Sequence, residues 1–114
     1  MTRKPPLILA ASLFFFITGI RPAQAQVDAE AALALAKRNN CFKCHGIDKR
    51  KTGPAYSSVA ARLKTNPVAV EVIVAHITSG RIVQLDDGTE EKHRIIDTKN
   101  PDELKNIALW ILSL

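Results

Sequence analysis

Cys41-Phe42-Lys43-Cys44-His45 is the stretch of sequence around which the chain is organised. Two thiols separated by two residues, with a histidine directly after the second, form the attachment sequence of a c-type haem. Each thiol is expected to form a thioether with one vinyl group of the porphyrin, and the imidazole to bind the iron. A Cys-x-x-Cys alone also permits a structural or redox-active disulfide. The adjacent histidine and the export signal at the N-terminus favour haem.

Residues 1–25 have the pattern of a secretory signal peptide. A basic start precedes an apolar stretch over residues 7–20, and Ala23-Gln24-Ala25 has the small-x-small pattern of a cleavage site. The alternative is a retained membrane anchor, but the apolar stretch is shorter than the ~20 residues that span a bilayer. The sequence therefore predicts export to the periplasm, cleavage near Ala25, and one mature domain over residues 26–114 with no stable membrane insertion.

The charge of the chain lies partly in this signal. Its cations, Arg3, Lys4 and Arg21, account for the fall in formal charge from +5 for the whole chain to +2 after cleavage. Nucleic-acid binding therefore has no support. The remaining cations gather near the haem motif: Lys37, Arg38, Lys43, Lys49, Arg50 and Lys51. They form either a solvated surface that offsets the haem propionates or a positively charged edge that steers an acidic redox partner.

Gly53-Pro54 marks a turn shortly after the motif. A backbone carbonyl in this turn can accept a hydrogen bond from the second imidazole nitrogen of His45 and so fix its tautomer, as iron-ligating histidines generally require. Tyr56 is expected to pack on the porphyrin or to bond a propionate.

With Val59-Ala60-Ala61-Arg62, these motifs resemble the small bacterial monohaem class I cytochromes c, over about residues 29–80 and the final helix. The resemblance implies an all-α class I cytochrome c fold: about four short helices around one covalent haem c, with crossed terminal helices. It implies that Cys41 and Cys44 carry the thioethers, that His45 binds the iron and that the Pro54 carbonyl supports His45. It also places His76 where related chains contact a haem propionate; the alternative is a partly buried or surface histidine.

Helix signals recur along the mature chain. Capping residues and apolar periodicity predict helices over residues 29–39 after Asp28, 57–63, 67–79 after the cap Asn66, and from 101 onward after the cap Asn100. Glu103 is expected to complete a capping box with Asn100. Trp110 is expected to pack near the first helix or the haem edge.

The sixth iron ligand is the point where the chain departs from the resembling family. That family normally uses a methionine from the region corresponding to residues 81–99, but the only methionine here is Met1. Counted back from Trp110, His93 lies within about a residue of that position. We expect a hairpin of residues 81–85 and 89–96, with its turn at Asp86-Asp87-Gly88, to present His93 to the distal side. Ile95 or Ile96 is then expected to shield the iron. His93 is alternatively a solvated loop residue, which leaves the sixth site to His76, a lysine, an asparagine, water or nothing.

The sequence thus predicts a periplasmic, monomeric single-electron carrier with a His/His-ligated haem of low potential. No catalytic triad, second metal cluster or phosphate loop is apparent, so we expect no enzyme activity. One alternative is a haem-based sensor or small-ligand-binding protein with an open or displaceable sixth site. Another is the cytochrome subunit of a periplasmic dehydrogenase. The expected partners are redox proteins, either acidic ones or such a dehydrogenase.

Overall fold

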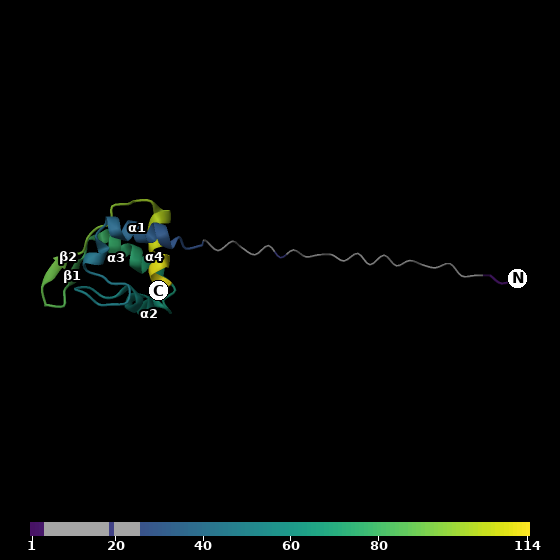
Figure 1. The fold of residues 1–114 in the computed structure, drawn as a ribbon, viewed down its shortest axis with the longest axis horizontal. Helices are drawn as coiled ribbons and strands as arrows, with labels where there is room; N and C mark the ends of the chain where they lie inside the picture. Colours follow the sequence, from purple (N-terminus) through teal and green to yellow (C-terminus); the bar gives the residue numbers. More distant parts are fainter. Residues whose placement is uncertain (4–18, 20–25) are drawn as a thin grey trace.

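Four α-helices and one short hairpin make up residues 26–114 of the computed structural model, which describes these residues together with 1–3 and 19 (Figure 1). In chain order they are α1 (Ala29–Arg38), the 3-10 turn η1 (Cys41–Lys43), α2 (Tyr56–Leu63), α3 (Ala69–Ser79), β1 (Ile82–Gln84), β2 (Glu90–Lys92) and α4 (Pro101–Leu112). The predicted all-α class with about four short helices is confirmed. The predicted signal peptide and its cleavage point lie outside the described residues, apart from 1–3 and 19. Among the described residues, no helix has the length and apolar character needed to cross a membrane.

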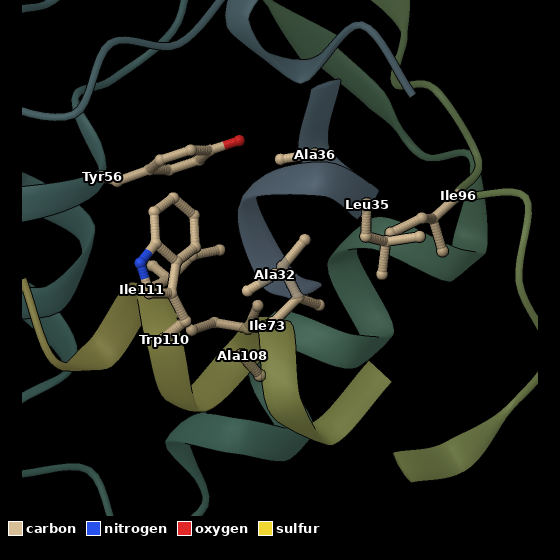
Figure 2. Packing of buried hydrophobic residues seen from close by; sticks show 10 residues of the cluster. Ala32, Leu35, Ala36, Tyr56, Ile73, Ile96, Ala108, Trp110 and Ile111 are labelled. Atoms are coloured by element: carbon tan, nitrogen blue, oxygen red, sulfur yellow. The ribbon is translucent and has the colours of Figure 1, made fainter. Parts of the chain in front are cut away.

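The two terminal helices, α1 and α4, pack against each other. Small side chains such as Ala32, Ala36 and Ala108 are buried in the core and permit close approach of the two helices (Figure 2). Asn106 of α4 also pairs with Asp28, the residue that caps α1: its Oδ1 accepts from the Asp28 N–H and its Nδ2 donates to the Asp28 carbonyl, both at 2.8 Å. The N-terminus of α1 is therefore tied to α4 by both polar and apolar contacts.

The apolar core lies between α1, α3 and α4, with Tyr56 of α2 at one side (Figure 2). Its larger buried members come from all four helices and from the segment after the hairpin: Leu35, Tyr56, Ile73, Ile96, Ile107, Trp110 and Ile111. Trp110, 4% exposed, packs edge to face on Tyr56 with ring centroids 5.7 Å apart. The predicted structural role of Trp110 is confirmed, and its partner is α2 as well as the core.

The start of α3 and the capping box of α4 differ from the predictions, whereas α4 begins at Pro101 as predicted. α3 begins at Ala69 instead of residue 67, because the Asn66 side chain accepts from the Val68 N–H in a turn that precedes the helix. The expected capping box at α4 is also modified. Asn100 caps the helix through Asp102 N (2.9 Å), but Glu103 bonds the Thr98 hydroxyl, whose oxygen accepts from the Asn100 N–H. The Thr98 hydroxyl therefore accepts the hydrogen bond from the Asn100 N–H that the Glu103 side chain was expected to accept.

The hairpin is antiparallel, with Val83 opposite Glu91. Its strands are shorter than the predicted stretches 81–85 and 89–96, since pairing stops where the chain turns back to the core. Gly88 adopts a φ of +84° and donates to the Leu85 carbonyl at 3.0 Å, so the predicted turn is confirmed. At the start of the hairpin, Gly80 ends α3 with a φ of +61°. A Cβ at Gly80 would lie 2.9 Å from the tip of Ile95. The positive φ and this close contact therefore both favour glycine at the C-terminal end of α3.

Candidate functional site

The helices and the hairpin surround a cavity of about 590 Å³. The residues of the haem motif line one side of it, and residues of α3 and the hairpin line another. Its lining combines apolar side chains with a few convergent polar groups, as is usual in cofactor sites. The predicted site residues among them are Cys41, Cys44, His45, Pro54, Tyr56, His76 and His93. The structure therefore brings every predicted site residue to one cavity.

His45 is held by its own segment of chain. Its Nδ1 lies 2.7 Å from the Pro54 carbonyl oxygen, as predicted, so Nδ1 carries the proton and donates. The loop between them is closed by the Gly53 N–H, which donates to the Cys44 carbonyl at 2.8 Å. Burial lowers the pKa of His45, a change that the Pro54 contact partly opposes. The imidazole is therefore biased to the neutral form, with Nε2 left for a metal.

Tyr56 supports His45 in a way that the sequence did not reveal. The two rings stack with centroids 5.1 Å apart and an angle of 17° between their planes. Phe42 and Trp110 meet Tyr56 edge to face at 5.9 and 5.7 Å. Tyr56 thus transmits the rigidity of the core to the imidazole. Its expected contact with the porphyrin or a propionate stays a prediction.

Cys41 and Cys44 are free thiols, each partly buried in the cavity lining. Burial raises the pKa of Cys41, although the Tyr56 hydroxyl and the Arg94 charge oppose the change. A raised pKa keeps the Cys41 thiol protonated near neutral pH. No disulfide joins these two cysteines in the structure, and both residues line the cavity.

His93 faces the same cavity from the segment that follows β2. Its backbone N–H donates to the Arg81 carbonyl at 2.8 Å, and its Nδ1 lies 2.9 Å from the Arg94 carbonyl oxygen. The ring centroids of His45 and His93 are 6.2 Å apart. Two imidazoles that bind one metal ion from opposite sides, each at about 2 Å, have ring centres about 6 Å apart. The 49° between their planes is compatible with this, because the angle of a ring about its metal–nitrogen axis does not change the distance between the ring centres.

His76 packs against His93 instead of standing alone beside the apolar face of α3. The two rings meet edge to face with centroids 4.4 Å apart. Arg81 Nη1 lies 3.4 Å from His76 Nδ1. Burial, then the neighbouring charges of His93 and Arg81, lower the pKa of His76 to about 4. His76 is therefore neutral at physiological pH and acts as a wall against the His93 ring.

These residues fit a covalent haem. Both thiols, one imidazole with a free Nε2, and a second imidazole at metal-bridging separation converge on one cavity. The apolar lining suits the porphyrin faces; Val59, Leu63, Val83 and Ile96 contribute to it. Of the two isoleucines expected to shield the iron, Ile96 is buried in this lining and Ile95 is 50% exposed. The donor set and the apolar surface therefore match the predicted cofactor.

The sequence reading missed most of the cations around the cavity. Lys43 had been noted, but four others line it as well: Arg62, Arg81, Lys92 and Arg94. Glu91 is the one carboxylate among the lining residues that the structure describes. These five cations, termed the basic rim below, come from α2, the hairpin region and the haem motif. Their distance in sequence hid them, because no local run of charge marks the group.

Comparison with known proteins agrees with a covalent haem in this cavity. The family model described as Cytochrome c matches residues 29–114. Cytochrome c-551 of Pseudomonas aeruginosa is 31% identical over 103 residues, covering 90% of this chain and 94% of its own length. Cytochrome c-552 of Hydrogenobacter thermophilus is 31% identical over 80 residues, 70% of this chain and 78% of its own. The crystal structure of the class 1 cytochrome MtoD from Sideroxydans lithotrophicus is similar with a TM-score of 0.74 and 46% identity, covering 77% of this chain and 97% of that one.

Proposed function

The chain belongs to the cytochrome c family, and from this premise we propose that it is a periplasmic one-electron carrier with His45 and His93 as its two axial ligands. As a member of the family it is a small electron carrier with covalently attached haem c. When bound, the haem supplies exchange of single electrons at its iron. The protein's part is to hold the cofactor, set its potential and present its edge to partners.

The observation that carries the ligand assignment is the 6.2 Å separation of the His45 and His93 rings across the cavity. Cys41 and Cys44 form the thioethers, and the Pro54 carbonyl orients His45 by accepting from Nδ1. His93 is oriented in the same manner, since its Nδ1 lies against the Arg94 carbonyl. In both rings the nitrogen left for the iron is Nε2.

The potential is expected to be low for the family, because residues 26–114 contain no methionine. Methionine sulfur stabilises ferrous iron, whereas a second imidazole favours ferric iron. Replacing His93→Met is expected to raise the reduction potential by a fraction of the ~0.8 V that axial ligands span. A protein film voltammogram of both forms measures the change.

The basic rim favours an acidic redox partner. Lys43, Arg62, Arg81, Lys92 and Arg94 carry positive charge around the cavity, opposed by Glu91. Such a field speeds encounter with negatively charged molecules, and salt screens it. We expect faster electron exchange with hexacyanoferrate, an anion, than with a cationic ruthenium complex matched for driving force, and a smaller difference at high salt. Equal rates at low salt would assign the rim to the haem propionates alone.

The remaining parts of the proposal rest on the sequence. The pattern of residues 1–25 supports export and cleavage near Ala25, which the mass of the secreted protein would test. Ligation of the iron by both histidines would leave no open site for a substrate, which supports transport of electrons over enzyme chemistry. A sixth site that opens readily would favour the alternative, small-ligand binding.

The test is the ferric optical spectrum of two variants. His93→Ala removes the proposed ligand, so we expect conversion from low-spin to high-spin iron and rapid cyanide binding. His76→Ala is the matched control, since it removes a histidine from the same cavity but no proposed ligand, and should stay low-spin. Unchanged low-spin iron in His93→Ala would exclude His93 as the ligand, and a high-spin spectrum in His76→Ala alone would transfer the role to His76. A high-spin spectrum in the unmodified protein would support ligand binding.

A further inference from the structure

Asn39 has a buried side-chain amide whose nitrogen and oxygen both form hydrogen bonds. It is 1% exposed, at the C-terminal end of α1. Its Nδ2 donates to the Leu35 carbonyl at 2.9 Å and to Asp97 Oδ1 at 2.8 Å, while its Oδ1 accepts from the Asp97 N–H at 2.9 Å. A buried amide that lost these partners would leave unsatisfied donors and acceptors, so the arrangement specifies one position for Asp97.

This pair joins the two walls of the cavity. Asn39 lies two residues before Cys41, where the haem-attachment segment begins. Asp97 lies four residues after His93, at the point where the hairpin returns to the core. Its neighbour Ile96 is buried and donates its N–H to the Ile77 carbonyl at 2.9 Å, which anchors the same segment on α3.

We propose that Asn39 is a positioning residue which, through Asp97, fixes the distance between the haem-attachment segment and the segment that carries His93. The strands of the hairpin are poorly suited to fix this distance themselves. Both residues of its central pair, Val83 and Glu91, are at least partly exposed, and no face of either strand is buried. The backbone of residues 96 and 97 is therefore the point at which the structure sets the reach of His93 toward His45.

The chemistry of the pair explains why an asparagine stands at position 39. Only a side-chain amide offers a donor and an acceptor side by side, matched to the carboxylate and the N–H of one residue. An aspartate at position 39 would place two carboxylates together, and a leucine would strand the Asp97 N–H. The hydrogen bonds from Asn39 and Arg38 lower the pKa of Asp97, so its carboxylate is charged near neutral pH.

The chain contains a matched control. Asn106 makes the same kind of reciprocal pair with the backbone of Asp28, at the opposite end of α1. It ties α1 to α4 and lies on neither segment that carries a histidine. Asn39→Ala and Asn106→Ala therefore each remove a reciprocal amide pair from one end of the same helix, three bonds from a buried side chain in the first and two exposed bonds in the second.

The experiment is hydrogen–deuterium exchange of the haem-loaded protein at the amides of Ile96 and Asp97. Asn39→Ala is expected to raise their exchange rates at least about tenfold, because a buried hydrogen-bonded contact is lost. Asn106→Ala should leave them within about twofold while it speeds exchange at the start of α1. Equal acceleration at Ile96 by both variants, or none by Asn39→Ala, would overturn the proposal.

A second variant keeps the test usable if Asn39→Ala fails to fold. The Asp97 side chain is half-exposed, and of the three hydrogen bonds of Asn39, Asp97→Ala removes only the one that Nδ2 donates to the carboxylate. Asp97→Asn keeps a side-chain oxygen that can accept this bond. Arg38→Ala removes the ion pair to Asp97 (3.3 Å) but leaves Asn39 bonded. We expect faster exchange at Ile96 in Asp97→Ala, with exchange close to the unmodified rate in the other two. The same rate in all three would contradict the role of Asn39.

The proposal for Asn39 rests in part on the proposed ligation of the iron by His93, and the rate of cyanide binding tests the two separately. The rate of cyanide binding to ferric protein should rise about tenfold in Asn39→Ala and little in Asn106→Ala, if His93 is the group displaced. Faster amide exchange at residues 96 and 97 with an unchanged rate of cyanide binding would support the positioning role of Asn39 and refute His93 as ligand. An unchanged rate of amide exchange at these residues would refute the positioning role of Asn39, whichever residue is the ligand.

Discussion

The two walls of the cavity are built differently. The proximal segment, residues 41–56, holds His45 by contacts within itself: the Pro54 carbonyl, the Gly53–Cys44 hydrogen bond and the stacked Tyr56 ring. The distal segment, residues 81–99, holds His93 on an exposed hairpin and is fastened to the core at Ile96 and Asp97. The proximal ligand position is thus local and rigid, while the distal one depends on residues far away in sequence. Substitutions on the two sides should therefore have different consequences.

The largest difference is expected between loss of His45 and loss of His93. His45→Ala removes the proposed ligand beside the proposed thioether sites and the ring that Tyr56 stacks on, so the yield of haem-loaded protein should fall severely. His93→Ala leaves the proximal segment intact and should retain haem. The ratio of haem absorbance to protein absorbance after purification measures both. Similar haem loss in the two variants would show that the distal segment is equally needed for cofactor retention.

A pair of glycines makes the next comparison. A Cβ at Gly53 would lie 2.9 Å from the His45 ring and 3.1 Å from the Cys44 carbonyl oxygen, neither of which can move freely. Gly53→Ala should therefore destabilise the protein by about 2–3 kcal/mol and alter the ferric spectrum. Gly80→Ala has a left-handed backbone to strain but meets flexible side-chain tips, so a loss of about 1–2 kcal/mol with an unaltered proximal ligand is expected.

Denaturant unfolding and optical spectra of the two glycine variants check this pair. If Gly80→Ala changes the spectrum more than Gly53→Ala does, the assignment of rigidity to the proximal wall is wrong.

The sequence predicted the proximal wall far better than the distal one. The haem motif, the Gly53-Pro54 turn and a hydrogen bond from His45 to a carbonyl in that turn all involve neighbours in sequence, and the resemblance to class I cytochromes c named the Pro54 carbonyl as the acceptor. The caps Asp28 and Asn100 are local in the same sense and were also correct. The hairpin turn was found from Asp86-Asp87-Gly88, but its strand limits were not.

The features that sequence reasoning missed are long-range ones. Asn39 was expected only as the last residue of the first helix, because its partner Asp97 is 58 residues away. The basic rim and the stack of Tyr56 on His45 likewise depend on tertiary packing. Asn66 and Glu103 show a subtler limit: both residue types fit a helix start, but the Val68 N–H and the Thr98 hydroxyl competed for their side chains.

The smallest expected effect concerns the tip of the hairpin. Arg50, in the loop after the haem motif, forms a two-bond ion pair with Asp86. The pair is well exposed, so Asp86→Asn should speed amide exchange at Gly88 only a few-fold. High salt should produce a similar change in the unmodified protein. An effect on Gly88 as large as that of Asn39→Ala on Ile96 would mean that the tip, and not the base, fixes the hairpin.

The pH dependence of this ion pair follows from the charge of Asp86. Arg50 lowers the pKa of Asp86 below its ordinary value of 3.8. A carboxylate with a lowered folded pKa stabilises the native state above its unfolded pKa and stops doing so as the pH falls through the folded value. The Gly88 amide should therefore keep its protection from pH 7 down to about 4, and Asp86→Asn should lose this acid sensitivity.

The central claim, that two imidazoles from two differently built walls bind one iron, is tested most directly by the EPR spectrum of the oxidised, haem-loaded protein. The account predicts a low-spin ferric signal with the g-values of bis-imidazole ligation, which disappears in His93→Ala. A high-spin ferric signal in the unmodified protein would contradict it, and would mean that the hairpin leaves the sixth site open.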